Sequence, residues 1–497
     1  MMMPMPARSH HIAASGVAKA LADKGHDVTY VSGLDKGNKI NPANNKVICI
    51  GNPFESIISA YQEKQLSNFW VDEKSPLESL LFLMEWGVQL VNKTMSNPEV
   101  IAEISKPGQK YDLVIIEAFV FQESFVGLGH QFDVPVVALN PFGTCQWIND
   151  IMGNPVNPAW VPSPFLGFSD HMSFTQRAIN TMMHAASDLV YNYYYMPQQE
   201  AVLQEFWPGA PALQGLLRTK IGLTLVNNHF TLSYPMPMSP SVVEIGGLHI
   251  PEKPKPLPKD LKDFLDASKE GVVYFSMGSN LRTQDMPKVQ AEAILGALGA
   301  LKERVLLKWD GPTPKNLSPN IRVIEWAPQG DLLAHPNIRL FVTHGGLLST
   351  QESVFHGVPL VGIPMFGDQQ FNMLLAVQKG FCVKVDFKTM TRTTMDEALR
   401  EVLQKPKYKE AATRLSRLFR SKPLRPAESA VFAVEHILEH GADHLRPSSV
   451  GMPLYQVLLL DVILVALAPF LVVLLCCRAL CCRKRSGGAT SRAKKNN

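Results

Sequence analysis

Short apolar runs alternate with helical patterns along most of the chain. In the first half, residues 112–116 (DLVII) and 134–139 (VPVVAL) are apolar runs that predict buried strands. The second half predicts six more strands, at 272–276, 305–309, 321–326, 339–344, 359–364 and 382–387. Helical stretches lie between them, for example at 288–302, 346–356 and 368–379. Strands that alternate with helices predict an α/β fold with parallel, doubly wound sheets.

A proline-rich segment separates the two halves of this pattern. Residues 251–259 read PEKPKPLPK, with four prolines in nine positions. Such a segment is typical of a stiff, extended connector. We therefore expect one α/β domain over residues 1–250 and a second over 251–446.

The C-terminal region has the composition of a membrane anchor. Residues 457–477 (VLLLDVILVALAPFLVVLLCC) are about as long as a helix that crosses a bilayer, which needs ~20 residues. Pro469 is tolerable in such a helix, and Asp461 lies within two turns of its start. We place a transmembrane helix at 455–477 and a basic tail at 478–497. Positive charge stays on the cytosolic side, so the body is expected to be lumenal.

The net charge of +4 comes from this tail. Residues after 477 hold seven of the 48 basic residues and no acid, so the body has 41 basic and 44 acidic residues. The sequence therefore predicts no nucleic-acid surface. Lys494 and Lys495, third and fourth from the end, resemble the dilysine retrieval signal of endoplasmic reticulum membrane proteins.

The segment from Trp326 to Asn372 carries the most specific chemistry. His344-Gly345-Gly346 forms the turn between a predicted strand and a predicted helix. Ligands of open α/β sheets bind at the carboxyl ends of strands, where a helix N-terminus attracts anions. The turn therefore suits a diphosphate. Asp368 and Gln369, one strand later, could bond the hydroxyls of a sugar, and Trp326 offers a flat face for a base.

This segment closely resembles the donor-binding motif of the UDP-glycosyltransferase family, and similarity extends over nearly the whole chain. FSMGSN (275–280) and THGGLLSTQESVFHGVPLVGIPMFGDQQFN (343–372) resemble the insect branch in particular. The resemblance implies the GT-B fold, two facing Rossmann-like domains with the active site in the cleft between them. It also implies that the co-substrate is a UDP-sugar and that no metal is needed. By position, the implied donor-binding residues are Ser279, Trp326, Gln329, His344, Gly346, Ser349, Glu352, Asp368 and Gln369.

The family resemblance also implies the catalytic base. Ser9-His10 matches the histidine that removes a proton from the acceptor hydroxyl, and we prefer His10 over the adjacent His11. Glu117 matches the acid that orients this histidine, although most relatives outside insects have Asp there. Glu123 is a second possibility, but a solvated helical position is the simpler interpretation for it. The reaction implied is an inverting displacement that transfers a hexose to a small lipophilic acceptor.

Three features remain open in the sequence. Residues 141–170, which hold Trp147 and Trp160, could line an apolar acceptor pocket or pack as a loop on their own core. Many vertebrate glucuronosyltransferases have Arg between two prolines where this chain has Met236. This difference favours glucose over glucuronate. Acceptors for detoxification and for hormone or phenolic conjugation all fit.

The amino end departs from the family pattern. Only MMMPMPA precedes Arg8, where relatives have a signal peptide and a first strand. We therefore expect a truncated N-terminus without the strand that supports His10. The alternative function is then a catalytically impaired partner that binds UDP-sugar and joins a homo- or hetero-oligomer. A Rossmann dehydrogenase is disfavoured, because no G-x-G-x-x-G follows a strand with an acid about 20 residues on.

Overall fold

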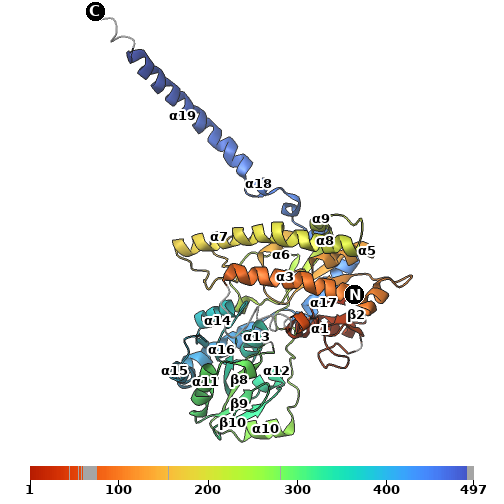
Figure 1. Ribbon diagram of the computed structural model, residues 1–497, viewed down its shortest axis with the longest axis vertical. Helices are drawn as coiled ribbons and strands as arrows, with labels where there is room; N and C mark the ends of the chain where they lie inside the picture. The colour runs from red at the N-terminus through yellow and green to blue at the C-terminus, as the bar shows by residue number, and fades with distance from the viewer. Residues whose placement is uncertain are drawn as a thin grey trace, which may run out of the picture. The chain divides into compact units, whose positions relative to one another are not determined.

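The computed structural model describes residues 1–43, 45–53, 55–57, 59, 75–154, 156–279 and 281–489. The chain divides into a large compact unit, Met1–Arg446, and a C-terminal unit that starts at Pro447. The large unit contains two parallel β-sheets with helices on their faces (Figure 1).

The first sheet has seven parallel strands in the order β3-β2-β1-β4-β5-β6-β7. Their bounds are β1 Met2–Met3, β2 Thr29–Ser32, β3 Lys46–Cys49, β4 Val114–Ile116, β5 Val136–Asn140, β6 Ile221–Val226 and β7 Val242–Glu244. The two strands predicted in this half correspond to β4 and β5. The others were missed because their runs are short or broken by polar and glycine residues, as in IGLTLV of β6.

Helices cover both faces of this sheet. They are α1 Arg8–Asp23, α3 Pro76–Met95, α4 Pro98–Ile104, α5 Val126–Gln131, α6 Gln146–Ile151, α7 Phe174–Val190, α8 Met196–Phe206 and α9 Leu213–Lys220. A five-residue π-helical turn, η2 Tyr191–Tyr195, joins α7 to α8. Helices α3, α7 and α8 contact one another on one side of the domain (Figure 1).

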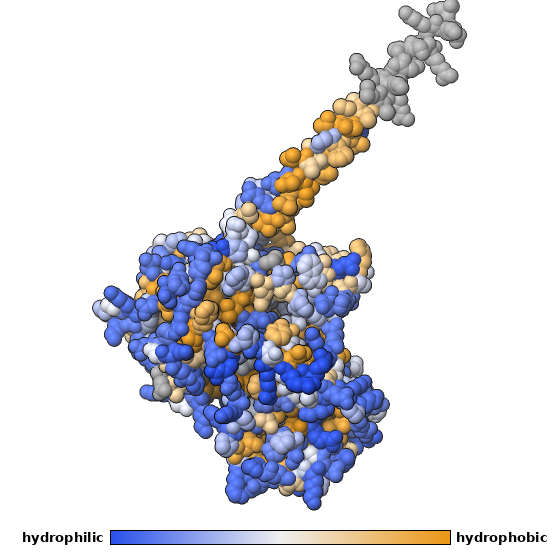
Figure 2. Space-filling view, turned by 180° about the vertical axis from the view of Figure 1, so that it is seen from behind, coloured by the Kyte–Doolittle hydropathy of each residue, from blue (hydrophilic) through white to orange (hydrophobic). Residues whose placement is uncertain are grey.

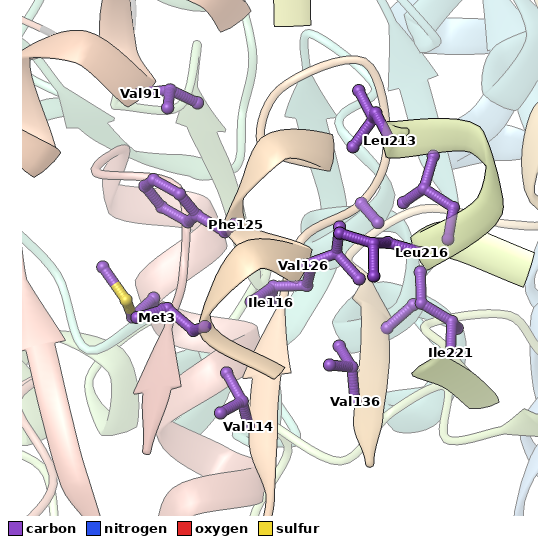
Figure 3. Close-up of a cluster of buried hydrophobic side chains, with 14 of the residues drawn as sticks. Met3, Val91, Val114, Ile116, Phe125, Val126, Val136, Leu213, Leu216 and Ile221 are labelled. Atoms are coloured by element: carbon purple, nitrogen blue, oxygen red, sulfur yellow. The ribbon is translucent and has the colours of Figure 1, made fainter. Parts of the chain in front are cut away.

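The strand expected to be missing before His10 is present, and this prediction was wrong. Met2 pairs with Tyr30 and Ile115, so β1 occupies the centre of the sheet. Its side chains alternate between the two faces. Met3 packs in the core that also holds Ile116 and Phe125 (Figure 3), and Met2 packs in the core on the α1 side. The sequence pattern hid this strand because it contains only two paired residues.

The second sheet has six parallel strands in the order β10-β9-β8-β11-β12-β13. The strands are β8 Val272–Ser276, β9 Arg304–Lys308, β10 Ile321–Ile324, β11 Ile338–Thr343, β12 Leu360–Gly362 and β13 Cys382–Lys384. Its helices are α10 Lys259–Asp266, α11 Lys288–Gly299, α12 Gln329–Leu333, α13 Leu347–His356, α14 Gln369–Gln378, α15 Arg392–Gln404 and α16 Pro406–Arg420. All six predicted strands are present, and the chain has the predicted doubly wound parallel architecture.

The last helix of the large unit returns to the first sheet. Helix α17 (Pro426–His440) packs against α1, β6 and β7. Its apolar residues, including Val431 and Ile437, share a core with Ala14 and Leu223. This helix lies within the range 251–446 that the sequence assigned to the second domain, yet it packs on the first, because its apolar face matches α1.

The C-terminal unit contains α18 (Leu454–Val457) and α19 (Leu460–Ala489). Residues 460–479 are long and apolar enough to cross a membrane, with a mean hydropathy of 2.8. Figure 2 shows this apolar surface in orange. The candidate span therefore starts a few residues later than the predicted helix at 455–477. Lys494 and Lys495 lie outside the described residues.

Candidate active site

The predicted catalytic pair is in direct contact. His10 lies in the first turn of α1, and Glu117 directly follows β4. The carboxylate Oε2 of Glu117 is 2.5 Å from Nδ1 of His10, and both side chains are almost fully buried. When Nδ1–H donates to the carboxylate, Nε2 is left as the proton acceptor of the neutral ring. This arrangement orients a general base.

The adjacent His11 has a different environment. Its Nε2 accepts the backbone N–H of Gly33 at 2.9 Å, and its Nδ1 is 2.8 Å from the hydroxyl of Tyr30. Burial, with a smaller contribution from His10, lowers the pKa of His11 to about 3. Both nitrogens are used inside the domain, so His11 holds α1 against β2 and cannot serve as the base.

Aromatic rings surround the His10 side chain. Phe121 and Phe142 both meet the imidazole edge to face, with ring centroids 5.7 and 5.5 Å away. Phe119 bridges Phe142 and Trp147, and Trp147 stacks on Tyr191 at 5.0 Å. Within residues 141–170, the packing alternative is confirmed for Trp147, and the acceptor-pocket alternative stays a prediction. Phe142 contacts the base, whereas Trp147 belongs to the core.

The turn that the sequence predicts to bind a diphosphate lies between β11 and α13. Gly346 is the N-cap residue of α13, and Gly345 has φ 84°, which favours glycine. Burial lowers the pKa of His344 to about 4, so its ring is neutral at physiological pH. A Cβ at position 278 would lie 2.5 Å from Cε1 of His344, so Gly278 lets this ring approach the β8 turn that carries Ser279.

Three predicted donor residues form one hydrogen-bonded group. The amide of Gln329 donates to Ser349 Oγ at 2.9 Å and to Glu352 Oε2 at 2.5 Å. Burial raises the pKa of Glu352 to about 7, although the bond from Gln329 opposes the shift. Glu352 is thus a partly buried carboxyl group held by a neighbour. A helical Glu taken alone would instead be expected to be solvated.

The two predicted sugar-binding residues lie at the start of α14. Asn372 Nδ2 donates to Asp368 Oδ2 at 2.8 Å and to the carbonyl of Gly345 at 3.0 Å, which ties this helix to the diphosphate turn. Burial raises the pKa of Asp368 to about 6, partly offset by Asn372 and by the nearby charge of His10. The side-chain oxygen of Gln369 accepts the backbone N–H groups of Met365 and Phe366.

Trp326 contacts two cations that the sequence did not single out. The guanidinium of Arg8 lies 4.1 Å from its ring centroid, and the amine of Lys308 lies 5.7 Å away. Lys308 is nearly buried and also donates to the carbonyl of Gly278 at 3.0 Å. A lysine at the end of an apolar strand, as in VLLK, was the available signal for Lys308. Arg8, which lies in α1 two residues before His10, thus connects the first domain to the donor motif.

Glu123, the alternative partner of His10, is neither in contact with it nor solvated. It lies in the short helix η1 (Glu123–Phe125), is fully buried, and bonds Tyr191 and Tyr195. The expectation of a solvated position was wrong, because tyrosines about 70 residues later in the chain cover it. Glu117 is the carboxylate that reaches His10.

Comparison with known proteins identifies the family. The model of the family described as UDP-glucoronosyl and UDP-glucosyl transferase matches residues 1–492. The chain belongs to this family. It is 33% identical over 464 residues to UDP-glycosyltransferase UGT5 of Dactylopius coccus, covering 93% of this chain and 87% of that protein. It is 31% identical to human UDP-glucuronosyltransferase 2A2, covering 94% and 90% of the two chains. The protein is therefore a UDP-glycosyltransferase, a hexose-transferring enzyme.

Solved structures agree on the fold of this UDP-glycosyltransferase. The glycosyltransferase VinC in complex with dTDP superposes with a TM-score of 0.60 at 17% identity, covering 89% of this chain and 99% of that chain. The calicheamicin glycosyltransferase CalG4 gives 0.56 at 18% identity, covering 89% and 98%. The predicted GT-B fold, two Rossmann-like domains, is confirmed.

The raised pKa of Glu352 predicts a pH dependence of donor binding. If Glu352 binds the ribose, as the family resemblance implies, only its ionised carboxylate can accept from both hydroxyls, so affinity should rise as the pH increases through about 7. If binding requires ionisation, UDP-glucose should bind about tenfold more tightly at pH 8 than at pH 6. UDP-glucose is the proper probe, because its diphosphate does not titrate in this range. Isothermal titration calorimetry at the two pH values measures the ratio.

The control for this pH dependence is Glu352→Gln. Asp368, with its pKa raised to about 6, can still contribute, so the variant should retain at most about a twofold ratio between the same pH values. An unchanged tenfold ratio in Glu352→Gln would show that another group senses pH.

Proposed function

We propose that this enzyme transfers glucose from UDP-glucose, with inversion, to the hydroxyl of a small lipophilic acceptor. The observation that carries the proposal is the His10–Glu117 contact at 2.5 Å, together with the contact of nearby Arg8 with Trp326 of the donor motif at 4.1 Å. The base comes from the first sheet and the donor motif from the second. A hydroxyl bound beside His10 would therefore face the sugar of a bound donor.

The reaction needs one proton transfer and one displacement. Nε2 of His10 takes the acceptor hydroxyl proton while the oxygen attacks the anomeric carbon. The bond from that carbon to the UDP oxygen breaks, and attack from the opposite face inverts the configuration. Glu117 stabilises the imidazolium that forms and keeps Nε2 directed at the acceptor.

The leaving group carries developing negative charge on its diphosphate. The N-terminus of α13 supplies backbone N–H groups and a partial positive charge where Gly346 begins the helix. His344 adds a neutral hydrogen-bond donor, and the buried amine of Lys308, which also pairs with Asp310 at 3.0 Å, lies nearby. With these groups we expect the leaving group to be stabilised without a bound metal.

The rings around His10 support an aromatic acceptor. Phe119, Phe121 and Phe142 present apolar faces and edges next to the base, and aromatic pairs favour offset or edge-to-face packing. A planar phenol would place its hydroxyl at Nε2 and its ring against these side chains. Detoxification of plant phenolics and conjugation of hormones both use acceptors of this kind.

The preference for glucose follows from Met236. This residue occupies the position where many vertebrate glucuronosyltransferases have Arg, and its sulfur accepts the hydroxyl of Thr144 at 3.3 Å. A thioether cannot pair with the carboxylate of glucuronate. The presence of β1 beneath His10 also weakens the alternative of a non-catalytic partner, which rested on the loss of that strand.

We further propose an endoplasmic reticulum location with a single membrane span. The apolar segment 460–479 supplies the span, and the basic residues that follow favour a cytosolic tail with a lumenal body. Lys494 and Lys495 supply a retrieval signal of the dilysine type.

Microsomes from cells that express the full chain test the sugar preference. With a panel of simple phenols, UDP-glucose should give a kcat/KM at least about tenfold above that of UDP-glucuronate, because a buried carboxylate without a cation costs more than 1.4 kcal/mol. Products are identified by mass spectrometry. Faster glucuronide formation would refute the assignment of glucose, and Met236→Arg should shift the ratio towards glucuronate.

A further inference from the structure

The first domain contains a buried carboxylate that the proposed reaction does not use. Glu123 is fully buried, and its Oε1 accepts the backbone N–H of Val120 at 2.7 Å and the hydroxyl of Tyr191 at 3.2 Å. Its Oε2 accepts the hydroxyl of Tyr195. Burying a carboxylate is unfavourable unless such donors surround it. We therefore expect this network of hydrogen bonds to serve a function.

The backbone bonded by Glu123 is in an unfavourable conformation. Val120 has φ 60°, in the left-handed region that a β-branched residue rarely adopts. Asp133, Asn316 and Leu459 are the other non-glycine residues with positive φ in the described ranges, and none of these is β-branched. Strained residues of this kind persist only where surrounding contacts impose them. The bond from Val120 to Glu123 is such a contact.

The strained turn lies between the catalytic carboxylate and the wall of the acceptor site. Glu117 is three residues before Val120, and its N–H donates to the side chain of Gln122 at 3.1 Å. Phe121, directly after Val120, contacts the His10 ring. The backbone direction at Val120 therefore sets the relative positions of Glu117 and Phe121 around the base.

Further hydrogen bonds and close packing surround the Glu123 network. Tyr191 and Tyr195 come from the π-helical turn η2, a feature that is frequent at functional sites. The Tyr195 hydroxyl accepts from Gln199 Nε2 at 2.8 Å, and Gln199 Oε1 accepts the hydroxyl of Ser124 at 2.7 Å. Helix α3 also packs closely here, because a Cβ at Gly87 would lie 2.2 Å from the carbonyl of Val120 and 3.1 Å from the Tyr195 hydroxyl.

The geometry points to Glu123 as a positioning residue of the transferase. It fixes the left-handed turn at Val120, and this turn holds the Glu117 carboxylate on Nδ1 of His10. Glu123 touches neither substrate nor the reacting atoms, so it acts through Glu117. This inference rests on the proposed function, in which His10 and Glu117 form the base.

A double-mutant cycle on the full-length enzyme tests whether Glu123 acts through Glu117. Glu123→Leu, which is similar in size and has no acceptor for the Val120 N–H, should lower kcat about tenfold with KM for UDP-glucose unchanged, because a small displacement of a catalytic group is costly. In the Glu117→Gln background the same substitution should lower kcat less than about twofold. An equal factor in both backgrounds would overturn the positioning role. If Glu117→Gln alone kept the wild-type kcat, the proposed role of Glu117 as the partner of His10 would be refuted, and the positioning role of Glu123 with it.

A second cycle tests the turn itself. Glycine adopts φ 60° without strain, so a chain with Val120→Gly needs Glu123 less. The kcat ratio between Val120→Gly and Val120→Gly/Glu123→Leu should fall below about threefold, against about tenfold in the parent. Comparing the two chains within one background removes the cost of the cavity left by valine. A tenfold ratio in the glycine background would contradict the role of the turn.

Discussion

Replacement of His10 by alanine is expected to lower kcat about a thousandfold, in the middle of the range for loss of a general base. The imidazole is the group beside the acceptor site that Glu117 orients, at 2.5 Å. The predicted donor-binding residues lie in the second domain, after β8, β10 and β11 and at or near the starts of α12, α13 and α14. The affinity for UDP-glucose should therefore remain within about twofold of the wild-type value, since these sites do not share a residue.

Glucosyl transfer to a simple phenol and calorimetric binding of UDP-glucose measure the two quantities separately. Normal donor binding also shows that the His10→Ala protein is folded. Imidazole added in excess should restore part of the rate by acting as an external base. A variant that keeps more than about a tenth of the wild-type kcat would exclude His10 as the base, since a base contributes at least ~100-fold.

The second sheet was largely predictable from the sequence, and the first was not. Strands such as β8 and β11 are continuous runs of buried apolar residues flanked by helices with clear periodicity. By contrast, β1 is a pair of methionines, and β7 has only three residues. Short runs of this kind become strands because neighbouring strands pair with them, and this information lies outside the local pattern.

The candidate site likewise contains residues that could be predicted from the sequence and residues that could not. Residues of the segment from Trp326 to Asn372 lie close together because consecutive strand ends of a parallel sheet meet at one edge. The His10–Glu117 contact followed from resemblance to the family. Arg8 and Lys308 were missed, and Glu123 was expected to be solvated, because their environments depend on contacts between distant elements. Lys308 meets Gly278, 30 residues away, and Glu123 meets Tyr195, 72 residues away.

Substitution of Gly278 by alanine is expected to weaken UDP-glucose binding about 30-fold. Gly278 has φ 80°, and a Cβ there would lie 2.5 Å from Cε1 and 2.8 Å from Nε2 of His344. The ring cannot stay in place, so the diphosphate loses His344 and the β8 turn is strained. A combined cost of about 2 kcal/mol corresponds to the expected factor. Calorimetry with UDP-glucose measures it directly.

Gly380→Ala is the matched control for this prediction. Gly380 has φ 83°, but a Cβ there would have only an ordinary contact, 3.7 Å from Ala411. Both variants should lose similar thermal stability, because both place alanine in the left-handed region. Only Gly278→Ala should lose donor affinity, because His344 lies against position 278 and not against position 380. Equal losses of affinity would mean that general strain in the second domain, rather than displacement of His344, weakens the donor site.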